Sequence, residues 1–374
     1  MSLTGVLRFT ALCVSAHCVL IAACPDPACL LTQVRVDLSR NDLDALKSNL
    51  RELAARFPND LETHATLARI LAEKNLFMLA LAEALRAGPA ATVQLAALEN
   101  AVGAYSDALG NALPAEKNSQ LPSELRASAA GVAGLSYESL GEPEPALEHL
   151  KTAIQLDPSR DNSYLALADL CERLQKYADA VDVLQQARLH AGDSPAMLLS
   201  LGADLIRAEK YSDGIQILHT LLQRDPKVEQ AYISLADAAR RMGNPDQEVE
   251  ALEGLARCNP RYPMLHVLIA RAMLNKEHPS YPAILRELAL AERSTPADPD
   301  VFFLRGKVLA ALGRQQEAIS ALRRSIELRP MEPGPYYQLA KLYQKLGKAG
   351  MAREQFERVK ILETAGSFSE KMNK

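Results

Sequence analysis

A spacing of 34 residues between helix-ending residues constrains this chain more than any other feature. These residues follow one another at steps of 34, with one step of 36, at Pro158, Gly192, Pro226, Pro260, Pro296 and Pro330. Proline cannot continue a helix, and glycine supplies the backbone geometry at which many helices end. A fixed period of this length is typical of stacked repeats, each built from one helix pair that contacts its neighbours.

A second register of small side chains follows the same steps. Its members are Gly134, Ala168, Gly202, Ala236, Ala270, Gly306 and Ala340, and a matching set on the following helices is Ala146, Ala180, Gly214, Ala318 and Ala352. Small side chains allow two antiparallel helices to approach closely. Glu248 departs from this register, because it stands where a small residue is expected. The absence of Trp and an aromatic content of only 5% also favour helices over a β-sandwich.

This pattern resembles the tetratricopeptide repeat. One unit reads Ala133, Gly134, Tyr137, Gly141, Ala146, Leu150, Ala153 and Pro158, and another reads Phe302, Gly306, Gly313, Ala318, Leu322 and Pro330. The resemblance implies an all-α fold, a right-handed α-solenoid of antiparallel helix pairs. We expect seven units, at residues 127–160, 161–194, 195–228, 229–262, 263–298, 299–332 and 333–366.

Outside these units the pattern is weaker. Residues 41–126 are expected to hold two or three degenerate helical repeats. In the last of them only one helix, Thr92–Leu113, is apparent, and Pro114–Pro122 reads as a linker. Two extra residues in the unit from 263 are expected in the turn around Asn275–Tyr281, and residues 367–374 form a tail.

The N-terminus reads as a targeting segment. Phe9–Ala23 carries no charge and is too short to span a bilayer, but its length suits the apolar core of a secretory signal. It ends in Ile21-Ala22-Ala23-Cys24, which resembles a bacterial lipoprotein signal. The resemblance implies that residues 1–23 are removed, that Cys24 is lipid-modified, and that 24–40 form a tether on the periplasmic or cell-surface side of a membrane. Ordinary export and cytoplasmic retention remain alternatives.

No catalytic or metal-binding motif stands out. The sequence has no GxxxxGK[ST], GxGxxG or HExxH pattern, and its seven His residues share no ligand spacing. Six Cys residues in so long a chain do not suggest a disulfide framework, and Cys171 and Cys258 occupy apolar helix positions expected in the core. We therefore expect no enzyme, no cofactor and no metal site.

The net charge of −4, from 42 basic and 46 acidic residues, argues against a general nucleic-acid-binding protein. Its distribution is uneven, since residues 299–374 contain 14 Lys or Arg and 8 Asp or Glu, which makes that segment basic. Binding of a protein or peptide partner is the function class that remains.

The resemblance implies that first helices line a concave ligand groove. Position five of each unit would supply an apolar row, at Gly131, Leu165, Leu199, Ile233, Val267, Phe303 and Tyr337. Neighbouring inward positions would supply a mainly basic row, at Arg207, Arg240, Arg241, Arg271, Lys307, Lys341 and Lys345, with Asp237 among them. Together the rows predict an extended acidic partner segment with apolar side chains, held by a lipid-anchored scaffold.

Other roles stay open. Anionic lipid headgroups or glycans could bind the basic row of an envelope protein. A cytosolic regulatory or chaperone-like adaptor is another alternative, although Leu165, Asp169, Ile233 and Asp237 do not match the Lys and Asn of the family's carboxylate clamp. Homo-association through the C-terminal end is also open, since the last helix carries Phe356, Val359, Ile361 and Leu362.

Overall fold

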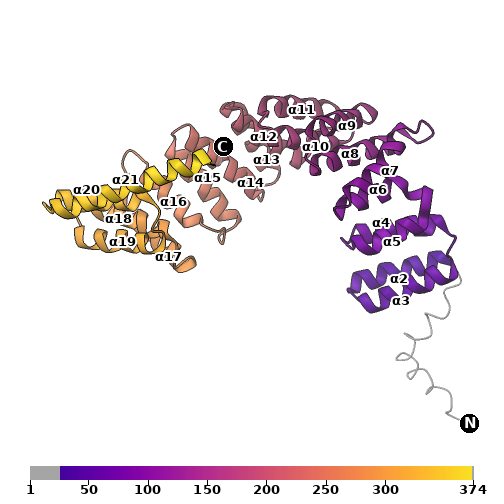
Figure 1. Ribbon diagram of the computed structural model, residues 1–374, viewed down its shortest axis with the longest axis horizontal. Coiled ribbons are helices and arrows are strands. Elements are labelled where there is room, and N and C mark those ends of the chain that lie inside the picture. The colour runs from indigo at the N-terminus through magenta and orange to yellow at the C-terminus, as the bar shows by residue number, and fades with distance from the viewer. Residues whose placement is uncertain (1–25, 373–374) are drawn as a thin grey trace, which may run out of the picture. The chain divides into compact units, whose positions relative to one another are not determined.

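The computed structural model describes residues 26–372. Within this range the chain forms 20 α-helices and one short 3-10 helix, and the helices pack as consecutive pairs (Figure 1). The chain divides after Gly192 into two compact units, here called the N-terminal and the C-terminal unit. The all-helical fold class is confirmed. The proposed signal peptide and Cys24 lie outside the described residues.

The N-terminal unit contains five pairs. They are α2 (Pro27–Arg40) with α3 (Leu43–Arg56), α4 (Leu61–Ala72) with α5 (Phe77–Ala87), α6 (Thr92–Ala101) with α7 (Tyr105–Lys117), α8 (Ser123–Ser139) with α9 (Pro143–Leu156), and α10 (Asp161–Arg173) with α11 (Tyr177–His190). The 3-10 helix η2 (Gly88–Ala91) connects α5 to α6.

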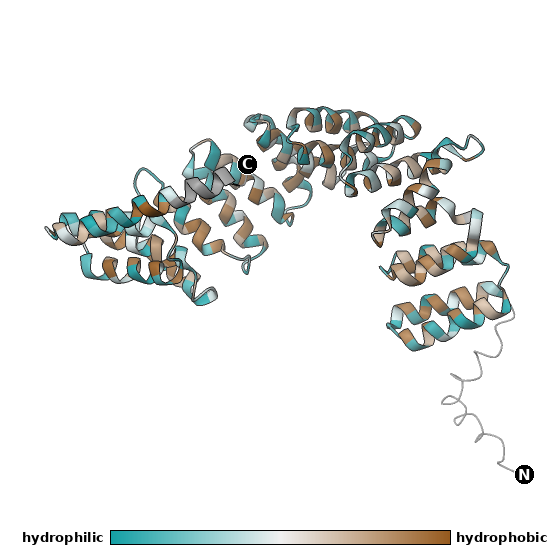
Figure 2. Cartoon of the chain, in the orientation of Figure 1, coloured by the Kyte–Doolittle hydropathy of each residue, from teal (hydrophilic) through white to brown (hydrophobic). Residues whose placement is uncertain are grey.

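The C-terminal unit contains five more. They are α12 (Pro195–Arg207) with α13 (Tyr211–Arg224), α14 (Glu229–Arg241) with α15 (Pro245–Cys258), α16 (Leu265–Leu274) with α17 (Tyr281–Ser294), α18 (Pro299–Ala311) with α19 (Gln315–Leu328), and α20 (Pro333–Lys345) with α21 (Ala349–Met372). Hydrophobic stretches alternate with hydrophilic ones along these helices, as Figure 2 shows, and the apolar side forms the core between partners.

Most of the expected tether and the first part of the expected linker are helical instead, whereas residues 118–122 form the loop between α7 and α8. Leu30 and Val34 of α2 are fully buried in the core that α3 and α4 share, so residues 27–40 belong to the first pair. Asp26 caps this helix by accepting a hydrogen bond from the Cys29 amide at 2.9 Å. The single helix expected at Thr92–Leu113 is two helices, α6 and α7, and Pro114 lies inside α7. These units escaped the sequence pattern because their register residues have drifted while their apolar faces remain.

Both ends of the repeat pattern depart from even spacing. The two extra residues of the unit from 263 fall in the turn between α16 and α17, as predicted. At the C-terminus α21 continues through 24 residues, so most of the predicted tail extends the last helix. None of the helices in residues 26–372 is both long and apolar enough to cross a membrane.

The small-residue register has a direct structural cause. Gly202 of α12 and Gly214 of α13 face each other, and a Cβ on Gly214 would lie 2.8 Å from the Gly202 carbonyl oxygen. That separation is shorter than any ordinary contact, and a backbone atom cannot swing aside. The two helices can therefore pack at this distance only if residue 214 lacks a side chain.

Gly214→Ala is expected to destabilise the C-terminal unit by about 1–3 kcal/mol, because it overpacks this helix contact. The matched control is Gly110→Ala in α7, where an added Cβ meets nothing within 4 Å. That change should stabilise its helix by about 0.5–1 kcal/mol through helix propensity. Urea unfolding followed by circular dichroism measures both, and equal effects of the two substitutions would contradict the close-approach explanation.

Candidate ligand groove on the first helices

The first helices of neighbouring pairs lie side by side in the C-terminal unit. α12 packs against α14, α16 against α18, and α18 against α20. A hollow of about 250 Å³ between α12 and α14 is lined by Ala203, Ile206, Arg207, Ile233, Ser234 and Asp237. The structure thus brings the predicted residues Arg207 and Ile233 to one surface, here called the first-helix face of the unit.

Two aromatic residues on this face each carry a lysine one helical turn later. The Lys307 ammonium lies 5.7 Å from the centre of the Phe303 ring on α18, and that of Lys341 lies 5.5 Å from the Tyr337 ring on α20. Tyr337 is 44% exposed and rests edge-on against Phe356 of α21 at 6.0 Å. We call these four residues the lysine–aromatic ladder. A cation over the face of an aromatic ring is attracted to that ring. Its other side can still contact an anionic ligand.

The lysines at this end have no acidic neighbour to neutralise them. Within residues 26–372, Lys307, Lys341 and Lys345 form no ion pair. Lys341 and Lys345 are also exposed. Their charges are available to a ligand, and the ladder therefore presents apolar surface and net positive charge together.

The predicted basic row is partly neutralised farther toward the N-terminus of this unit. Arg241 Nε donates to Asp237 at 2.7 Å, and Arg240 pairs with the same carboxylate. Arg207 lies 3.1 Å from Asp204, which is only 1% exposed. The hydrogen bond that Arg241 donates to Asp237 also raises the pKa of Arg241. Sequence spacing singled out these cations but could not show that they form ion pairs with acids one turn away.

The residues of the predicted apolar row differ in how much of each side chain is exposed. Val267 is 3% exposed and belongs to the core between α16 and α18, so it cannot contact a ligand. Leu199 and Ile233 are half-buried against the core of α12–α16. Leu165 is half-buried in α10 of the N-terminal unit, and the ladder does not include it. Position five is therefore buried at Val267, half-buried at Phe303 in the next unit, and exposed at Tyr337 in the last unit.

Glu248 is a buried acid that is not among the predicted groove residues. It lies at the small-residue position of α15 and is 5% exposed. Burial raises the pKa of Glu248, Arg271 and Arg240 lower it to a smaller extent, and Asp237 raises it again. Arg271, from α16, thus faces a carboxylate of its own chain. The departure from the small-residue register was the sequence feature that marked this position.

Glu248→Gln is expected to stabilise the protein at pH 7. A folded-state pKa above the unfolded value means that the carboxylate form costs stability, so wild type loses stability as pH rises through that folded pKa. Below the unfolded pKa, near 4, both proteins carry a neutral group and the difference should disappear. Melting temperatures from pH 3.5 to 8 measure this, and a pH-independent difference would contradict the assignment.

The described cysteines occupy three different environments. Cys171 is buried, as predicted, whereas Cys258 is only half-buried and its thiol donates to the Lys227 carbonyl at 3.1 Å. Burial raises the pKa of the Cys258 thiol. Cys29 is disulfide-bonded, which the sequence did not lead us to expect. Within residues 26–372 no cluster of three or more His, Cys, Asp or Glu could hold a metal ion.

The C-terminal end shows a mixed surface. Val359 and Leu362 of α21 are buried against Tyr336, whereas Ile361 is 56% exposed and Met351 45% exposed. The apolar residues predicted to drive homo-association therefore divide between the core and the surface.

Family models of the tetratricopeptide repeat match residues 139–203, 199–263 and 306–347. Over these residues the chain contains tetratricopeptide repeats, and proteins with such repeats are typically non-catalytic and generally act as protein–protein interaction scaffolds. The family models lie within the region predicted from the 34-residue register, and no curated protein matches the chain.

Several solved structures are similar to this chain. A tetratricopeptide repeat protein from Parabacteroides merdae is 15% identical over 68% of this chain and 97% of its own, with a TM-score of 0.46. PilF of Pseudomonas aeruginosa is 20% identical over 59% and 96%, with a TM-score of 0.44. YrrB, described as having an unusual peptide-binding site, is 15% identical over 51% and 97%, with a TM-score of 0.44.

Proposed function

We propose that this protein is a non-catalytic scaffold that holds an extended, acidic segment of a partner protein on its first-helix face. The lysine–aromatic ladder supports this proposal, because its rings offer apolar surface beside lysines that no acid of the described chain neutralises. Burial of apolar side chains of the partner supplies affinity, and the lysines supply attraction and register.

Helix spacing restricts the conformation of the bound segment. Packed helices lie about 8–10 Å apart, so equivalent side chains of α18 and α20 repeat at that distance. A polyproline II segment places every third side chain on one side, at a repeat of about 9 Å. Acidic residues three positions apart can therefore reach Lys307 and Lys341 together, with an apolar residue between them over the rings.

Two synthetic peptides of equal composition test this function. One carries Glu at every third position of a proline-rich segment with Leu between, and the other carries the same residues with all Glu consecutive. Titration of the full chain by fluorescence anisotropy should show the spaced peptide binding at least about tenfold more tightly at low salt. Equal affinities would overturn the spacing argument, and no binding of either would overturn the peptide groove.

Anionic lipid headgroups are the alternative ligand for the same lysines. Vesicles of phosphatidylglycerol, compared with neutral phosphatidylcholine vesicles, distinguish the two. Sedimentation of the chain with the anionic vesicles, without binding to the spaced peptide, would assign the ladder to a membrane surface and refute the scaffold proposal.

We also propose that the protein is exported and anchored to a membrane by a lipid. The support is the sequence alone, an uncharged segment followed by Ala22-Ala23-Cys24. Expression with the native leader should place the protein in the membrane fraction, and Cys24→Ser should release it. An unmodified protein in the cytosolic fraction would instead support a regulatory or chaperone-like adaptor.

A second copy of the chain is a further proposed partner, through the exposed Ile361 and Met351. Light scattering at tens of micromolar tests it, and a monomeric mass would exclude this association.

A further inference from the structure

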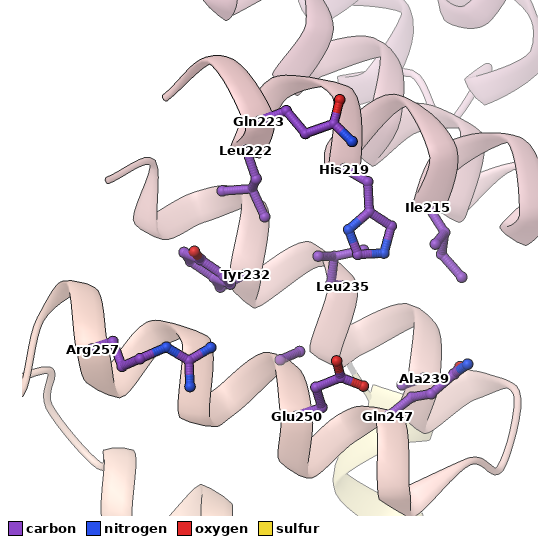
Figure 3. Close-up of a pocket in the computed structure, with 11 residues that line it drawn as sticks. Ile215, His219, Leu222, Gln223, Tyr232, Leu235, Ala239, Gln247, Glu250 and Arg257 are labelled. Carbon is purple, nitrogen blue, oxygen red and sulfur yellow. The ribbon is translucent and has the colours of Figure 1, made fainter. Parts of the chain in front are cut away.

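A second surface of the C-terminal unit carries an open groove that the proposed function does not use. α13 and α15 form its walls and α14 its floor, and the hollow between them measures about 380 Å³. Figure 3 shows His219 and Leu222 on one wall, Tyr232 and Leu235 below, and Glu250 and Arg257 on the other wall. We call it the α13–α15 groove.

Small residues on α15 make room for the hollow of this groove. Ala251 lines the hollow, and Gly254 one turn later allows the Tyr232 ring to lie against the helix. A Cβ at residue 254 would lie 2.4 Å from that ring. The Tyr232 hydroxyl is directed away, since it donates to the Pro226 carbonyl at 3.2 Å. The floor is consequently apolar, with Leu235 and Ala239 both buried.

One equivalent position in each of the three following pairs carries a polar side chain bonded to a second helix. His266, in register with Tyr232, lies 2.8 Å from Glu287 of α17. Arg305, in register with Leu235, lies 2.6 Å from Glu292, and Tyr343, in register with Ala239, accepts from Arg323 at 2.9 Å. These bonds tie first and second helices together across the corresponding surfaces. None of the three α14 residues forms such a bond, because Leu235 and Ala239 are apolar and the Tyr232 hydroxyl donates to the Pro226 carbonyl.

The rim of the groove carries one acidic and one basic side chain. Glu250 and Arg257 are exposed, and within residues 26–372 neither forms an ion pair. They are seven residues apart on one helix, which corresponds to about 10.5 Å along its axis. A groove with an apolar floor between one acid and one base, two turns apart, matches the surface of an amphipathic helix.

We propose that the α13–α15 groove binds a short amphipathic helix of a partner protein. One or two large apolar side chains of that helix enter the hollow over Leu235, Ala239 and Ala251. An acidic residue of the partner pairs with Arg257, and a basic residue seven positions away pairs with Glu250. This site is independent of the lysine–aromatic ladder, so a partner can be held at both places.

Charge compensation with model peptides tests the proposal on the full chain. The first probe is an alanine-based helical peptide with Glu at one position, Leu three and four positions later, and Lys at the seventh. The second probe replaces that Lys with Glu. Wild type should bind the Glu/Lys peptide about tenfold more tightly than the Glu/Glu peptide, and Glu250→Lys should reverse this preference.

Glu253→Lys is the matched control, because it makes the same charge change on α15 outside the groove lining. It should leave the wild-type preference unchanged. Leu235→Arg, which introduces the residue that α18 has in this register, should abolish binding of both peptides. If that variant does not fold, replacement of both peptide leucines by Gln tests the same apolar contact.

The proposal is overturned if Glu250→Lys and Glu253→Lys change the peptide preference equally, since that would indicate general charge attraction. It is also overturned if the Gln-substituted peptide binds as well as the original. Lys307→Glu should not affect any of these measurements, so failure here and failure of the ladder are separable.

Discussion

Reversal of Lys307, Lys341 and Lys345 to Glu is expected to weaken binding of the spaced acidic peptide by at least about a hundredfold at low salt. These lysines have no acidic partner in the described chain, so each reversal replaces an attraction with a repulsion. Titration at several salt concentrations measures the effect. Attraction by these lysines predicts that binding of the wild type weakens as salt rises and that the variant lacks this dependence.

Two controls separate this effect from net charge and from general basicity. Lys47→Glu, Lys74→Glu and Lys151→Glu together change the net charge by the same amount at exposed positions of the N-terminal unit, which does not contain the ladder. Arg240→Gln and Arg241→Gln remove cations that Asp237 already pairs. Both sets should cost less than about fivefold. Equal losses in all three variants would show that the ladder is only part of a diffuse basic surface.

Glu83→Ala is expected to destabilise the N-terminal unit by about 3–5 kcal/mol, a large part of the stability of most domains. Glu83 is 3% exposed, and its carboxylate accepts from Nδ1 of His64 at 2.6 Å and also pairs with Arg86. His64 is fully buried, and its Nε2 has no hydrogen-bond partner in the described chain. Removal of the carboxylate leaves the imidazole without either bond in an apolar core.

A similar pair in the C-terminal unit gives the comparison. His266 and Glu287 lie 2.8 Å apart, but their side chains are 28% and 26% exposed. Water can replace the lost contact there, so Glu287→Ala should cost about 1 kcal/mol or less. Hydrogen exchange at the amides of α4 and α5, and separately of α16 and α17, reports each unit on its own. Comparable losses at both sites would contradict the role assigned to burial.

Sequence alone determined the period, the helix pairs from residue 127 onward and the place of the two-residue insertion. Each of these depends on local chemistry. Proline ends a helix wherever it stands, and Gly202 opposite Gly214 lets two helices approach whatever surrounds them. Because each repeat contains the same local pattern, the pattern can be recognised from the sequence alone.

Only the tertiary structure decided which residues form a surface. Val267 and Tyr337 share a repeat position, yet one is buried beneath α18 and the other is exposed beside Phe356. Arg241 and Lys341 were both predicted to face inward, but only Arg241 forms an ion pair with Asp237. Leu235 and Arg305 also share a repeat position, yet Arg305 is bonded to Glu292 of a second helix whereas Leu235 lines an open hollow. Burial and ion pairing depend on side chains from neighbouring helices, and the spacing along one chain does not contain that information.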